Sequence, residues 1–175
     1  MCAVKVSIAR RESPEQVGHF ASMAAQSSGV EVVEATRIAA QAVSTAASES
    51  YGPFGAGNTS HQVAMAKAAV LATRVPFSTA AELVAATCGK AVAKQSLNNG
   101  LSRAKMSHEV QLAVAAAGIG PESSSELVAK IAATAAAGHA AAGGAGPQEV
   151  RQAAQEATEG IAVDDTNQLL AQVAV

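Results

Sequence analysis

The chain has 175 residues, enough for one domain or two small ones, and its 12 basic and 14 acidic side chains leave a formal charge of −2. This balance argues against a nucleic-acid-binding protein, whose surface would be strongly basic. Alanine accounts for 44 residues, whereas the chain has three Phe, one Tyr and no Trp, so aromatic packing cannot be its main source of stability. Because alanine is the best helix former, the composition predicts an all-α protein, with alanine-rich helices paired in hairpins in an elongated or bundle-like array.

Residues 1–72 are predicted to form a short arm followed by helices. Apolar and polar residues alternate over residues 4–8, which is the period of a strand, so residues 1–12 are expected to be an extended arm. Helical periodicity and capping sequences place the N-terminal helices in residues 13–72. These helices are predicted to begin at the capping sequence Ser13-Pro14-Glu15-Gln16, at Val30 and at a second capping sequence, Thr59-Ser60-His61-Gln62.

The middle of the chain, residues 76–119, is predicted to be a helical hairpin. A capping sequence from Thr79 to Glu82 opens an alanine-rich helix, and Asn98-Asn99-Gly100 separates it from a second helix that ends near residue 117. The same pattern also allows one long helix with a kink at Asn99-Gly100.

Residues 120–175 are predicted to hold the C-terminal helices, joined by an alanine- and glycine-rich linker over residues 138–147. With this part, residues 1–175 are expected to form a single helical domain. The C-terminal helices are predicted to begin at the capping sequence Ser123-Ser124-Ser125-Glu126, at Pro147 and at the acidic cap Asp164-Asp165.

The supply of large apolar side chains is small for a chain of this length. Leu, Ile, Val and Phe together make up 35 of the 175 residues. A thin core is therefore expected, because buried apolar area is the main favourable contribution to folding. We infer that part of the stabilising burial occurs between chains.

The two cysteines, Cys2 and Cys88, predict neither a disulfide framework nor a metal site, and whether either pairs with another chain is left open. Cys88 has Lys90 and Lys94 nearby, and cations of this kind lower a thiol pKa. A nucleophile also needs a positioned base, and the sequence offers none. Cys88 is therefore interpreted as a small buried side chain.

The four histidines lack the spacing of a metal site. His108 is followed by Glu109, but no second histidine follows at the spacing of a zinc protease. An unrecognised active site around Cys88 or His108 is the weakest of the functional hypotheses. We predict no catalytic, cofactor-binding or metal-ligating residue and no cofactor, and we interpret as exposed or cap-adjacent the histidines His19, His61, His108 and His139.

Other short patterns are also interpreted as structural. The glycine-rich residues 52–57 and 143–146 do not lead from a strand into a Gly-Lys-Ser/Thr sequence, so they do not predict a phosphate loop. The first residues lack the apolar stretch of a signal peptide. The longest uncharged run, between Lys130 and Glu149, is mostly Ala and Gly with a proline, which makes it a poor membrane span.

A more specific pattern lies in residues 75–119. A proline-led, alanine-rich helix is followed by an amide-bearing middle and by a second alanine-rich segment that closes on glycine and an apolar residue. The residues concerned are Val75-Pro76-Phe77, Leu83-Val84-Ala85-Ala86-Thr87, Gln95, Asn98, Asn99 and Ala115-Ala116-Ala117-Gly118-Ile119. This segment resembles the R-body (Reb, killing-trait) family and the related ejectisome proteins of cryptophytes.

The resemblance implies a structural protein without catalytic activity. Members of that family polymerise into a ribbon that coils into a compact roll and extends on a trigger. The implied location is a cytoplasmic inclusion or an extrusive organelle.

Two functional hypotheses follow. The first is a structural subunit that assembles with itself or with homologous subunits into a ribbon, sheet or filament. The alternative is a soluble helical-bundle module that binds a partner protein and has no enzymatic activity. Neither hypothesis involves nucleic acid or a membrane span, and a small-molecule ligand is not expected.

Overall fold

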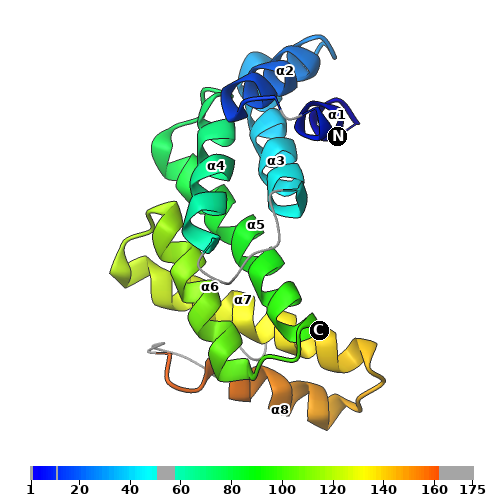
Figure 1. Ribbon diagram of the computed structural model, residues 1–175, viewed down its shortest axis with the longest axis vertical. Helices are drawn as coiled ribbons and strands as arrows, with labels where there is room; N and C mark the ends of the chain where they lie inside the picture. The colour runs from blue at the N-terminus through cyan, green and yellow to red at the C-terminus, as the bar shows by residue number, and fades with distance from the viewer. Residues whose placement is uncertain (1, 11, 51–57, 162–175) are drawn as a thin grey trace.

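The computed structural model describes residues 2–10, 12–50 and 58–161, and all regular structure in these ranges is α-helical (Figure 1). The predicted all-α fold class is therefore confirmed. The described helices are α1 (Cys2–Ala9), α2 (Pro14–Gln26), α3 (Val32–Ser50), α4 (Thr59–Leu71), α5 (Phe77–Asn98), α6 (Arg103–Ala117), α7 (Pro121–Ala142) and α8 (Pro147–Thr158).

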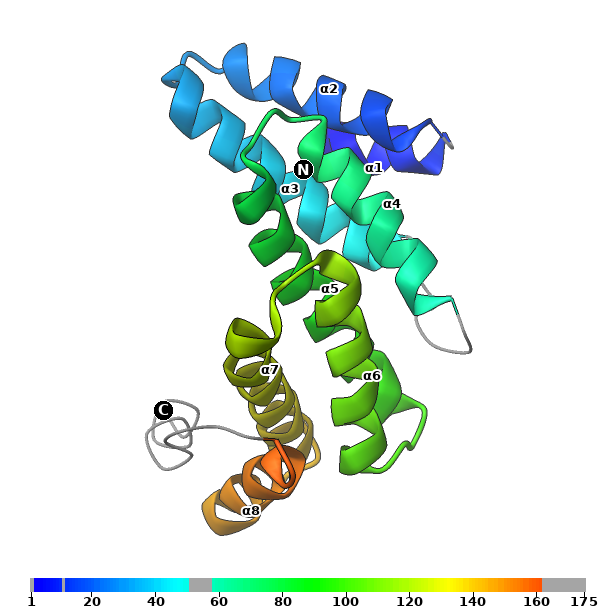
Figure 2. The same cartoon turned by 90° about the vertical axis from the view of Figure 1, so that its left-hand side faces the viewer.

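Helix α5 joins the two ends of an elongated array. Helices α1–α4 lie at one end of the molecule and α6–α8 at the other (Figures 1 and 2). Helix α5 packs against α3 and α4 in the first group and against α6 and α7 in the second, and α4 also packs against α6. Among the described residues, α1 and α2 make no contact with α6, α7 or α8.

The expectation of an extended arm in residues 1–12 is wrong, because α1 is a helix. Val4 and Ser7, three residues apart, are both buried, whereas Val6 is 49% exposed. A strand would have placed Val4 and Val6 on the same face. The alternation over residues 4–8 is too short to distinguish the two periods, and the packing of α1 on α2 and α3 decides between them.

Residues 76–119 form a hairpin of two helices, α5 and α6, rather than one kinked helix. Helix α5 ends at Asn98, and Gly100 has a φ of +73°, a left-handed conformation that glycine adopts without strain. Helix α6 then begins after Ser102, whose side chain accepts a hydrogen bond from the Lys105 backbone N–H.

The predicted linker over residues 138–147 is wrong at its N-terminal end. Helix α7 continues through Gly138 to Ala142, so the connection to α8 spans only residues 143–146. A glycine inside a helix costs about 1 kcal/mol relative to alanine, and the alanines on both sides of Gly138 outweigh this penalty. The predicted cap at Asp164-Asp165 lies outside the described residues, as do residues 52–57.

Of the four capping sequences within the described residues, one caps a helix as predicted. The one at Ser13 is confirmed: its side chain accepts from the Gln16 N–H, and the Gln16 side chain accepts from the Ser13 N–H. The other three are wrong, because α4, α5 and α7 begin at Thr59, Phe77 and Pro121 without a side-chain cap; their N-caps are Asn58, Pro76 and Gly120.

The core is built from small side chains. Of the 36 buried apolar residues in the described part of the chain, 22 are alanine and 11 are valine; the others are Cys88, Met106 and Ile131. No described leucine or phenylalanine is among them. Small side chains let helices approach closely. At Gly18 on α2, a Cβ atom would overlap the Ala69 carbonyl oxygen and lie 2.6 Å from Ala72 Cβ, so this contact with α4 requires glycine.

Candidate functional site

The thiol of Cys88 is fully buried in the core, as the sequence predicts. Burial raises its pKa to about 12, and a side-chain hydrogen bond with Thr87 lowers it by less. The thiol therefore stays protonated at neutral pH, and it is sealed from solvent. His108 lies on the exposed face of α6. The structure does not bring these two residues into a shared accessible site.

The histidines lie on four different helices. His19 is on α2, His61 on α4, His108 on α6 and His139 on α7, and all four are exposed. Within the described ranges, no three His, Cys, Asp or Glu side chains come together in a way that could hold a metal ion. No described helix has the combination of length and apolar character that crossing a bilayer requires.

Nine large apolar side chains in the described part of the chain are exposed. Val32 and Val33, at the start of α3, are 65% and 74% exposed. Phe20 and Met23, one turn apart on α2, are also exposed. Seven of the nine exposed large apolar residues in the described part belong to α1–α3 and the turn between α2 and α3. We call these seven the N-terminal apolar group: Val6, Phe20, Met23, Val30, Val32, Val33 and Ile38.

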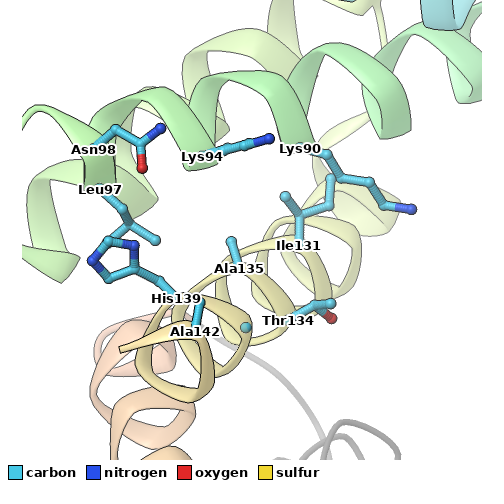
Figure 3. Close-up of a pocket in the computed structure, with 10 residues that line it drawn as sticks. Lys90, Lys94, Leu97, Asn98, Ile131, Thr134, Ala135, His139 and Ala142 are labelled. Carbon is cyan, nitrogen blue, oxygen red and sulfur yellow. The ribbon is translucent and has the colours of Figure 1, made fainter. Parts of the chain in front are cut away.

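A cavity of about 320 Å³ lies between α5 and α7 (Figure 3). Its walls are mainly apolar, and the charged side chains that line it come from α5. Lys90 and Lys94 are one helical turn apart and both reach the cavity, with Asn98 one turn further on. Helix α7 contributes the opposite wall. The remaining lining residues are Leu97, Ile131, Thr134, Ala135, Gly138, His139 and Ala142.

A more polar groove lies on the other side of α5, against α3. Its volume is about 640 Å³, and its lining includes Gln41 and Thr45 of α3 and Thr87 of α5. Lys90 and Lys94 line this groove as well. The two lysines therefore stand at the boundary between an apolar cavity and a polar groove.

No motif in the sequence indicates the cavity, because its walls come from helices about forty residues apart in the chain. Two partial signals exist. Lys90 and Lys94 share a helix face through their spacing of four, and Gly138 interrupts an otherwise alanine-rich helix. From the sequence alone, the two lysines are interpreted as neighbours of Cys88, and the glycine is interpreted as part of the linker over residues 138–147.

We found no family model, no curated protein and no solved structure that matches the chain. The resemblance of residues 75–119 to the R-body family therefore stays a prediction. The function is inferred from the surface and cavities of the molecule itself.

Proposed function

We propose that the protein is a structural subunit that assembles with copies of itself through helices α1–α3. One observation carries this proposal: seven of the nine exposed large apolar side chains in the described part of the chain lie on α1–α3 and the turn between α2 and α3, whereas the fully buried core is mostly alanine and valine. In most globular proteins leucine and phenylalanine are among the residues most often fully buried. Exposed apolar side chains that gather in one region are typical of protein–protein contacts.

The position of the N-terminal apolar group supports assembly at one end of the molecule. Helices α1 and α2 pack only within the α1–α4 group of the described chain, so they are the elements furthest from the α6–α8 end. A contact there between copies would extend the long axis of the molecule instead of covering its sides. The coiled, extrusible ribbon that the R-body resemblance implies is a special case of such an assembly.

The proposal is tested by the variant Val32→Ser/Val33→Ser. Burial of an exposed valine contributes about 1.5–3 kcal/mol, so the loss of two partly exposed ones should weaken association at least about thirtyfold. We expect wild-type protein to show concentration-dependent multimers in size-exclusion chromatography with light scattering. Negative-stain electron microscopy should show the same material as extended particles, and the double variant should move toward the monomer.

Leu112→Ser is the matched control, because Leu112 is also exposed and apolar but lies on α6. It should leave association unchanged. A wild-type protein that stays a monodisperse monomer at every concentration contradicts the proposal.

The second candidate is an interaction module for a different protein. It is favoured by the contiguous core from α1 to α8, which closes within one chain and needs no second copy. This candidate predicts a cooperative unfolding transition that does not depend on protein concentration. The same N-terminal apolar group would then contact the partner.

A further inference from the structure

The cavity between α5 and α7 combines apolar walls with cationic side chains. Leu97, Ile131 and Ala135 supply apolar surface, and Lys90 and Lys94 supply the charge. None of the lining residues is Asp or Glu. In the described part of the chain, neither lysine ammonium takes part in an ion pair or a hydrogen bond. A bound anion would therefore find two uncommitted cations beside apolar surface.

Gly138 lies in the wall of the cavity and adds no side chain to it. It lies inside α7, where glycine costs about 1 kcal/mol relative to alanine. Gly18 and Gly89 have close neighbours that a Cβ atom would meet, whereas a Cβ atom at Gly138 would meet nothing within 4 Å. Neither packing nor a positive φ explains glycine at this position. The missing side chain leaves space in the cavity wall.

We propose that this cavity binds a small amphipathic anion, a molecule with a medium-length apolar body and a single carboxylate. The apolar body would lie against Ile131 and Ala135, where water is displaced from apolar surface. The carboxylate would lie at the α5 side, where Lys94 and Lys90 can form charge-assisted hydrogen bonds to it.

The size and shape of the cavity fit this ligand class. A volume of about 320 Å³ is at the lower end of the range typical of small-molecule sites. In Figure 3 the side chains of α5 and α7 face each other across the opening, with Asn98 and His139 at one end and Lys90 near the other. Asn98 and His139 add N–H groups that can donate to an oxygen of the ligand.

The proposal is tested by titrating the full chain with decanoate and, separately, with octanoate, at concentrations below micelle formation, and following backbone amides by NMR. We expect saturable shifts for residues 90–98 and 131–142. The uncharged analogue 1-octanol should bind at least about tenfold more weakly than octanoate, because it cannot form the charge-assisted contacts.

Two variants test separately the charge of the two lysines and the open space beside Gly138. Lys90→Gln/Lys94→Gln should weaken decanoate binding about fivefold to tenfold, as expected for partly exposed charge pairs. Lys105→Gln/Lys130→Gln makes the same change in net charge at exposed positions outside the cavity, and it should have no effect. Gly138→Leu should abolish binding by filling the space, whereas Ala141→Leu on the exposed face of α7 should not.

Three results would overturn the proposal. One is the absence of saturable shifts at residues 90–98 and 131–142. Another is equal binding of octanoate and 1-octanol, which would mean that the lysines play no part. Shifts confined to residues 41–48 would place the anion in the polar groove against α3 instead. Circular dichroism of each variant reports separately whether its helices are intact, and self-association is measured in a different experiment.

Discussion

The three helical glycines, Gly18, Gly89 and Gly138, predict a graded response to substitution by alanine. Each Gly→Ala change gains about 1 kcal/mol of helix propensity. What differs is the neighbour that the new methyl group meets. At Gly18 the neighbours are the Ala69 carbonyl oxygen and the Ala72 Cβ, at 2.6 Å, and neither can rotate away.

The magnitude for Gly18→Ala follows from these contacts. Carbon atoms pack at about 3.5–4.0 Å, so α2 and α4 must move apart by roughly 1 Å. A gap of this size forfeits about a quarter to a half of the dispersion energy across the contact, and overpacking of a core typically costs about 1–3 kcal/mol. Because neither neighbour can move aside, we expect a cost in the upper part of this range, about 2–3 kcal/mol, and after the gain of about 1 kcal/mol in propensity a net destabilisation of about 1–2 kcal/mol. This corresponds to a Tm lower by roughly 2–8 °C.

The other two glycines act as internal controls. At Gly89 the nearest atom is the terminal Cδ1 of Ile131 at 2.8 Å, which can move by a change of rotamer, so Gly89→Ala should be close to neutral. At Gly138 nothing lies within 4 Å, so Gly138→Ala should stabilise by about 0.5–1 kcal/mol. Because the chain has no Trp and one Tyr, urea unfolding is best followed by far-ultraviolet circular dichroism. A Gly18→Ala variant as stable as the wild type would refute the reasoning.

Further predictions concern titration and two contacts between helices. The pKa of the Cys88 thiol is near 8.5 in an unfolded chain and about 12 in the folded one. As pH rises through this interval the unfolded state loses its thiol proton first, so the free energy of unfolding falls. Between pH 7 and 10 the wild type should lose about 2 kcal/mol more than Cys88→Ala in urea unfolding; equal losses would contradict the burial argument. Ser107 donates a hydrogen bond to the Ala157 carbonyl at 2.7 Å, and Ser107→Ala should destabilise by about 1–2 kcal/mol, measured as a lower urea midpoint. Lys67 donates to the Ala117 carbonyl at the end of α6 at 2.6 Å, and Lys67→Met should lower the thermal midpoint through a loss of about 1 kcal/mol.

The fold class could be predicted from the sequence because alanine propensity acts locally. The start of α2 could be predicted for the same reason, since the capping box at Ser13 involves residues only three apart. The predictions of an arm at residues 1–12 and of a linker at residues 138–147 are wrong because the local signals there are weak. In the arm, packing of α1 on α2 and α3, which no local pattern contains, determines that the chain is helical. At residues 138–142 the flanking alanines outweigh the single glycine that the linker prediction relied on.

The candidate sites were predictable only in part. Burial of Cys88 follows from the apolar character of its helix face. The cavity depends on which faces of α5 and α7 meet, and the surface position of Val32 and Val33 depends on α3 turning other residues inward. Both are properties of the packed molecule and have no counterpart in residue spacing alone.

A core of alanine and valine also changes which substitutions the protein can tolerate. In a leucine-rich protein the common damage is truncation, which leaves a void. Here 22 of the buried residues have only a methyl group to lose. The hazard is enlargement, because almost any replacement of a buried alanine adds atoms where two backbones already touch. Sequence drift in such a chain should therefore be concentrated on the solvent-facing positions of each helix, and its interior should resist change in one direction only, toward greater bulk.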